Sequence, residues 1–202
     1  MSQQRPAHRA ERLLRSQTAA GWAPCAADDL NATLADHAHC EKKAAASAIA
    51  LINDYPSDDA LVSALGRLAE EELGHFREVH ARLLQRGVAL GRDAGDPYAR
   101  ALLARVRQPN DERKLDRLLV CALIEARSCE RFRLLAEELS RRGEQDLAAW
   151  FSRLEASEAG HAGLFVHLAR ERFGAQADAR LDALTRDEAS IVASLPNLPR
   201  IH

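Results

Sequence analysis

The most constraining feature of this sequence is an ionisable motif that interrupts an apolar helical stripe twice. Residues 69–76 read AEEELGHF and residues 157–161 read SEAGH. In both segments a histidine follows a glutamate by three positions, which places the two side chains on one side of an α-helix. Gly74 and Gly160, directly before the histidines, each cost about 1 kcal/mol relative to alanine within a helix. We expect these glycines to allow close helix approach.

Helical periodicity predicts four long helices, at residues 28–53, 58–86, 111–142 and 145–173. Scarce aromatic residues, at 4%, and abundant Ala, Leu, Arg and Glu favour helices over strands. Pro56 is expected to end the first helix, and Ser57 or Asp58 to cap the second. Gly87 and Gly143 mark the ends of the second and third helices.

The long segment between the second and third helices predicts the topology. A helix of about 26 residues is roughly 40 Å long. Residues 88–110 can extend over about 70 Å, so helices two and three can run parallel. This favours an all-α, ferritin-like four-helix bundle with one long crossover. We expect a short helix within the crossover, at PYARALLARVR (97–107).

The domain organisation follows from the same elements. We predict a single ferritin-like domain over residues 1–202, with its bundle core at about 28–173. The segment before residue 28 is expected to pack as an accessory. An amphipathic accessory helix is predicted at about 176–194, before a proline-containing end.

One glutamate lies in the middle of the apolar face of each long helix. Positions spaced alternately three and four apart line this face. The second and fourth helices add a histidine three residues later, and no lysine or arginine occupies the four faces. The six ionisable positions are Glu41, Glu72, His75, Glu125, Glu158 and His161.

Buried carboxylates in this number require positive charge. Burying an unpaired one costs several kcal/mol, and a whole domain is stable by only about 5–15 kcal/mol. One Glu from each of two helices and a Glu-x-x-His from each of the other two form a known arrangement for two metals. Mostly oxygen ligands with one imidazole per ion suit iron or manganese better than structural zinc. The sequence therefore predicts a two-metal site at these residues.

Neighbouring residues offer alternatives. Glu71 lies four residues before His75, but Glu72 keeps the register of the apolar face. Glu130 lies about 140° around the helix from Glu125, so both cannot face the centre, and the apolar neighbours favour Glu125. Acidic residues on a helix usually lie on its solvent-exposed face. The apolar stripes that run through these positions argue against that interpretation here.

Two further histidines and the cysteines have simpler interpretations. His37 and His39 are possible extra ligands. His37, one turn before Glu41, is better interpreted as a core histidine or as a residue that supports a ligand. The cysteines are expected to be small buried fillers.

Four segments resemble a known family. HAHCEKKAA (37–45), EEELGHF (70–76), IEARSCERF (124–132) and SEAGHAGLF (157–165) are similar to bacterial tRNA hydroxylases of the MiaE type. The Glu-x-x-His pairs alone indicate only the ferritin-like superfamily, and the first and third segments narrow it. The resemblance covers most of the chain. It implies a non-haem di-iron centre whose ligands and catalytic residues match Glu41, Glu72, His75, Glu125, Glu158 and His161.

The resemblance also implies a reaction. The family uses dioxygen at two iron ions to hydroxylate the isopentenyl group of 2-methylthio-isopentenyl-adenosine beside the tRNA anticodon. The chain carries no flavin or nicotinamide fingerprint, so an external electron donor, a ferredoxin or reductase, is implied. The alternative function is a ferritin-like oxidase of iron or peroxide, or a metal-storage bundle, that does not act on RNA.

Bulk properties indicate a cytoplasmic protein with no membrane partner. The sequence has no run of 18 apolar residues, no secretory leader at its start, and no CxxC pair among its four cysteines. With a net charge of -2, RNA contacts would depend on local basic residues. The candidates are Arg5, Arg9, Arg12, Arg15, Arg100, Arg105 and Arg107.

Overall fold

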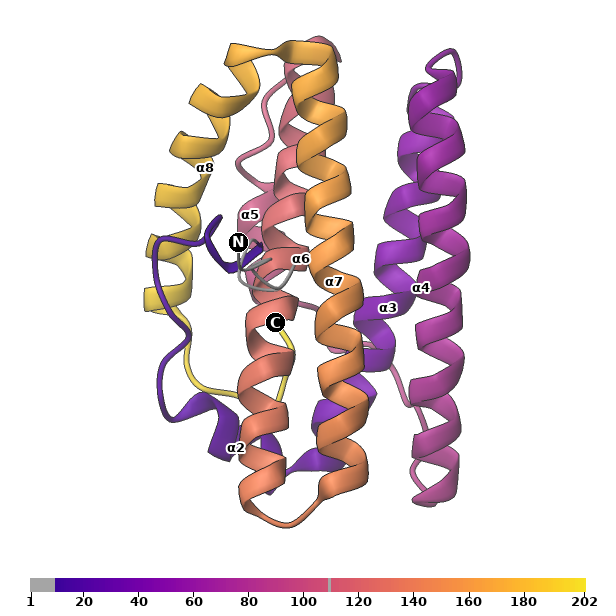
Figure 1. Ribbon diagram of the computed structural model, residues 1–202, viewed down its shortest axis with the longest axis vertical. Coiled ribbons are helices and arrows are strands. Elements are labelled where there is room, and N and C mark those ends of the chain that lie inside the picture. Colours follow the sequence, from indigo (N-terminus) through magenta and orange to yellow (C-terminus); the bar gives the residue numbers. More distant parts are fainter. Residues whose placement is uncertain (1–9, 109) are drawn as a thin grey trace, which may run out of the picture. The chain divides into compact units, whose positions relative to one another are not determined.

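The computed structural model describes residues 10–108 and 110–202. Within these ranges the chain forms seven helices and no strand, which confirms the predicted all-α class (Figure 1). None of these helices combines the length and hydropathy of a membrane-spanning segment. The helices are α2 (Trp22–Asp28), α3 (Leu30–Asp54), α4 (Asp59–Gln85), α5 (Pro97–Leu103), α6 (Asn110–Arg141), α7 (Gln145–Phe173) and α8 (Ala175–Ser194).

The ends of the long helices follow the predicted capping signals. Asp58, not Ser57, caps α4, because its Oδ1 accepts a hydrogen bond of 3.0 Å from the Leu61 amide. Asp29 caps α3 in the same way through Ala32. The helix predicted at 97–107 is shorter than expected and ends at Leu103, while α2 was not predicted as a helix.

The chain divides into two compact units. The first contains α5 to α8 and comprises the described residues of 1–25 and 96–198, together with His202. The second contains α3 and α4 and comprises residues 26–95 and 199–201. The division falls within α2, between Cys25 and Ala26.

The second unit is a hairpin of α3 and α4, joined by a short turn after Asp54. Both helices bury the apolar stripe predicted from their periodicity, including Leu34 and Leu51 on α3 and Leu65 on α4. The tail segment 199–201 lies on the same unit. There the Ile201 amide donates to Asp36 Oδ2 at 2.8 Å.

The first unit is a hairpin of α6 and α7 with α8 packed against both helices (Figure 1). The turn between α6 and α7 contains Gly143 at a φ of 85°, a conformation that favours glycine. Gly174, with a φ of 53°, separates α7 from α8. Phe132 and Phe151 join α6 to α7, with ring centroids 5.5 Å apart.

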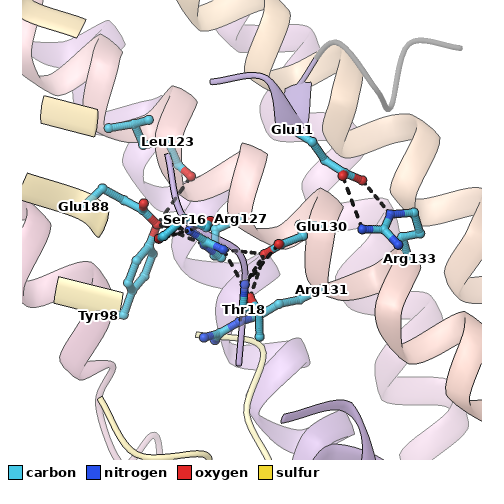
Figure 2. Close-up of polar contacts among 10 residues, drawn as sticks. All are labelled: Glu11, Ser16, Thr18, Tyr98, Leu123, Arg127, Glu130, Arg131, Arg133 and Glu188. Carbon is cyan, nitrogen blue, oxygen red and sulfur yellow. Dashed lines mark hydrogen bonds and ion pairs between the residues drawn. The ribbon is translucent and has the colours of Figure 1, made fainter. Parts of the chain in front are cut away.

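A buried ion-pair network holds the accessory segments on α6 (Figure 2). Arg127, fully buried, donates to Glu188 Oε1 on α8 at 2.9 Å and also pairs with Glu130. Tyr98 on α5 donates to Glu188 at 3.0 Å, and the Thr18 hydroxyl donates to Glu130 at 2.6 Å. These two buried acids therefore share a cation of the protein itself. We call Arg127, Glu130 and Glu188 the arginine network.

Candidate metal centre

The second unit contains one cluster of potential metal ligands, the α3/α4 half-site, made of Glu41, Glu72 and His75. All three side chains are buried. His75 Nδ1 lies 3.6 Å from Glu41 Oε2 and 3.6 Å from Glu72 Oε2. Each residue offers one ligand atom within 4.8 Å of the others. The i, i+3 spacing puts Glu72 and His75 on one side of α4, and the hairpin packing brings α3 beside them.

The first unit contains a matching cluster, the α6/α7 half-site, made of Glu125, Glu158 and His161. These side chains are also buried. His161 Nδ1 lies 3.7 Å from Glu158 Oε2 on the same helix. Glu125 on α6 offers a carboxylate oxygen within 4.8 Å of a ligand atom on each of the other two. The two half-sites therefore contain the same three residue types.

The geometry of each half-site fits a metal ion better than a hydrogen bond. A nitrogen-to-oxygen separation of 3.6–3.7 Å is too long for a hydrogen bond. Donor atoms that each lie about 2.0–2.2 Å from one ion are separated by roughly 2.8–3.8 Å at coordination angles of about 90–120°. Carboxylate oxygens with one imidazole nitrogen are also a donor set suited to iron or manganese.

The alternative acids lie elsewhere. Glu71 is exposed on α4, whereas Glu72 is fully buried. Glu130 is buried but belongs to the arginine network, where the Thr18 amide and hydroxyl also donate to it. Its place away from Glu125 agrees with the angular separation expected on one helix.

The two extra histidines have different surroundings. His37 Nε2 lies 2.5 Å from Glu41 Oε1. His39 accepts a hydrogen bond from Lys42 at its Nδ1 atom, at 2.9 Å, and burial is the largest cause of its lowered pKa. Only His37 therefore contacts a residue of the α3/α4 half-site through these bonds.

The expectation about the two glycines is wrong, and the one about the cysteines holds for two of the four. A Cβ at Gly160 would meet no described atom within 4 Å, and one at Gly74 would meet only the end of Arg77 at 4.0 Å. Close helix approach therefore does not explain either glycine. Of the cysteines, Cys121 and Cys129 are buried as expected, while Cys25 and Cys40 are partly exposed. Burial raises the pKa of the Cys129 thiol, which keeps it protonated.

The arginines considered for RNA contact are in varied environments. Arg5 and Arg9 lie outside the described residues. Arg107 binds the buried Asp116 through three nitrogens, and Arg15 pairs with Asp182 on α8. Arg12, Arg100 and Arg105 are exposed.

The arginine network was not anticipated from the sequence. The i, i+3 spacing of Arg127 and Glu130 was a usable local signal. The distant partner Glu188 had none, because 61 residues separate it from Arg127.

The all-α fold and the two Glu, Glu-x-x-His half-sites define a ferritin-like protein. The family model described as "MiaE: tRNA-(MS[2]IO[6]A)-hydroxylase (MiaE)" matches residues 5–202. The chain belongs to this family, as its four motif segments predicted.

Similar proteins agree with this assignment. The chain is 36% identical over 192 residues to the tRNA 2-(methylsulfanyl)-N(6)-isopentenyladenosine(37) hydroxylase of Pseudomonas putida, covering 94% of this chain and 91% of that protein. It is 29% identical to the hydroxylase of the same name from Salmonella typhimurium, covering 94% and 87%.

A solved structure is also similar. It is described as "Protein 43 with aldehyde deformylating oxygenase activity from Synechococcus". The TM-score is 0.88 and the sequence identity 36%, over 95% of this chain and 96% of that one. This similarity confirms the predicted ferritin-like fold.

Proposed function

We propose that this protein hydroxylates the isopentenyl group of 2-methylthio-isopentenyl-adenosine beside the anticodon of tRNA, with dioxygen as co-substrate. Two curated relatives are named as hydroxylases of this nucleoside, and the chain matches nearly their whole lengths. The observation that carries the proposal is the pair of matching buried half-sites on a chain of the MiaE family.

Both half-sites act together in this proposal, within a single domain over residues 1–202. Glu41, Glu72 and His75 with Glu125, Glu158 and His161 hold two iron ions. Their four carboxylates and two divalent ions have equal and opposite formal charges, which offsets the cost of burying the acids. When bound, the iron supplies the activation of dioxygen. The buried setting of the six ligands supports this assignment because it keeps water from the reacting C–H bond.

An external electron donor follows from the balance of the reaction. One oxygen atom enters the C–H bond and the other becomes water, which requires two electrons and two protons. The substrate supplies only the two electrons of its C–H bond. A ferredoxin or reductase therefore delivers the remaining pair, and the tRNA substrate implies a cytoplasmic location.

The Synechococcus structure supports a second candidate function. That protein is described as having an aldehyde deformylating oxygenase activity, and it is as similar to this chain in sequence as the Pseudomonas relative is. Under this alternative the same two half-sites would act on an aldehyde and not on RNA. A peroxide or iron oxidase, or a storage bundle, is the remaining possibility for such a centre.

Nucleoside analysis distinguishes these functions. We expect tRNA from cells lacking the gene to contain the prenylated, methylthiolated adenosine without its hydroxyl group, as seen by mass spectrometry of digested tRNA. The purified iron-loaded protein, supplied with a reductase and dioxygen, should restore the hydroxyl group. Persistence of the hydroxylated nucleoside in the deletion strain would refute the proposal. Turnover of an aldehyde with unchanged tRNA would favour the second function.

A further inference from the structure

His37 lies one turn before Glu41 on α3 and is fully buried. Its Nε2 atom is 2.5 Å from Glu41 Oε1. The other oxygen of the same carboxylate, Oε2, lies 3.6 Å from His75 Nδ1 on α4. The Glu41 carboxylate is therefore held between two imidazoles, with one oxygen directed to each. Only the contact with His37 has the length of a hydrogen bond.

This arrangement gives the two oxygens of Glu41 different roles. An ionised carboxylate only accepts hydrogen bonds, so the His37 ring donates from Nε2. The bond occupies Oε1 and restricts rotation of the carboxylate. Oε2, on the side of His75, is then the oxygen that would bind an ion shared with His75. Partners of this kind, bonded to a ligand and not to the metal, set the orientation of the ligand.

The α6/α7 half-site is built differently at the matching position. The residue four before Glu125 is Cys121, where the residue four before Glu41 is His37. A thiol is a weak hydrogen-bond donor, while an imidazole N–H is a strong one. The two half-sites therefore contain the same types of potential ligand. They differ in the side chain one turn before Glu41 and Glu125, which is an imidazole in the first case and a thiol in the second.

We propose that His37 is a positioning residue that orients Glu41 and makes the two metal positions unequal. It strengthens binding of the ion held by Glu41 and His75, and it leaves the ion of the α6/α7 half-site unaffected. This inference rests on the proposed two-metal centre.

Cobalt(II) titration of the full-length protein without iron tests the inference. Absorption spectra report the coordination of each ion, and calorimetry gives the two affinities. His37→Leu should weaken one of the two ions about 10- to 100-fold and leave the other unchanged. His37→Gln should regain most of that affinity, because an amide N–H can still donate to Glu41.

His39 provides the matched control. It is the same residue type on the same helix, is also buried, and bonds to Lys42. His39→Leu and His39→Gln should leave both cobalt affinities at the wild-type values. Melting curves of the metal-free variants separate a general loss of folding from a change at one ion.

Four results would overturn the inference. In the first, His37→Leu binds both ions as tightly as the wild type. In the second, both ions weaken together as the metal-free protein loses stability. In the third, His37→Gln is as weak as His37→Leu, which indicates a direct ligand. In the fourth, the His39 variants weaken the same ion equally. Failure of the wild type to bind two ions would instead refute the metal centre in the proposed function.

Discussion

The half-sites and the arginine network bury carboxylates in the same kind of helical scaffold, but with different partners. Glu130 and Glu188 are bonded to Arg127, with further hydrogen bonds from Thr18 and Tyr98 (Figure 2). Within the half-sites, by contrast, Glu72 lies 3.6 Å from His75 and Glu158 lies 3.7 Å from His161, which is too long for hydrogen bonds. Burial of an acid alone therefore does not identify a metal site. The kind of partner distinguishes the two sets of buried acids.

The pKa shifts in the network show that its buried charges depend on one another. Burial raises the pKa of Glu188, while Arg127 acts in the opposite direction. Burial also lowers the pKa of Arg127, but Glu188 and Glu130 outweigh it and the net shift is upward. Each member depends on the others for its charged state, so removing one should be costly.

Removing a half-site ligand should have the largest effect. We expect Glu72→Ala or His161→Ala to abolish iron loading, with a loss of affinity beyond the ~10- to 100-fold that outer partners contribute. Folding should be affected less, because the substitution removes a buried charged or polar group. Metal analysis of the purified variants measures the loading. The control is Glu71→Ala, at an exposed position one residue away. Full iron occupancy in either ligand variant would contradict the ligand set.

Removing the internal cation should reduce stability and leave metal loading intact. Arg127→Met leaves two buried carboxylates without their shared cation, at a cost of about 3–5 kcal/mol. For a chain of this size the melting temperature should fall by about 6–20 °C. Thermal unfolding measures this fall, and metal analysis below the melting temperature should still find wild-type iron content.

Arg133→Met provides the control for that variant. Arg133 is on the same helix but pairs with Glu11 at a partly exposed position, so its loss should cost less than about 1 kcal/mol. If Arg127→Met and Arg133→Met destabilised the protein equally, burial would not make the ion pairs of the arginine network more important for stability.

Asp116 is another buried acid that pairs with arginines, and its contribution to stability should depend on pH. Its buried carboxylate accepts hydrogen bonds from Arg107 and Arg180. Burial alone would raise the pKa of Asp116, but these bonds outweigh it and hold the pKa below its ordinary value of 3.8. The folded carboxylate thus binds protons less readily than the unfolded one. Its contribution to stability is complete above that ordinary value and is lost as the pH falls through the lower folded pKa.

Asp116→Asn should therefore destabilise the protein by about 1.5–3 kcal/mol at neutral pH. The difference from the wild type should be constant at neutral pH and should shrink below pH ~4. Urea unfolding across this range measures it. A difference that instead grew toward acid pH would reverse the expected sign.

The smallest expected effect is at the glycines before the two histidines. Because open space surrounds a Cβ at Gly160, Gly160→Ala should stabilise the protein by about 0.5–1 kcal/mol through helix propensity. Urea unfolding is the measurement, and Gly74→Ala should behave alike. A variant that is more stable but fails to hydroxylate tRNA would show that substrate needs this space. Loss of stability would contradict the open surroundings.

Most of the helix boundaries were predictable from local signals. The four long helices begin and end within two residues of the predicted positions, because capping residues and apolar periodicity act over one or two turns. The helix α2 and the early end of α5 were not predicted. Both are short, and short helices depend on tertiary packing more than on their own sequence.

The membership of the half-sites was predicted in the same local way. The register of an apolar stripe distinguishes Glu72 from Glu71, and the structure buries the first and exposes the second. The choice of Glu125 over Glu130 followed from the angle between them on one helix. That these six residues are the metal ligands stays a prediction.

The sequence by itself determined the helices and the buried face of each, since both depend on residues only three or four positions apart. Tertiary structure alone decided the distant partners of Glu130 and Arg127 in the arginine network. Thr18 reaches Glu130 across 112 residues, and Glu188 reaches Arg127 across 61. Such contacts form only when distant segments pack together, and the spacing of residues along one helix contains no information about them.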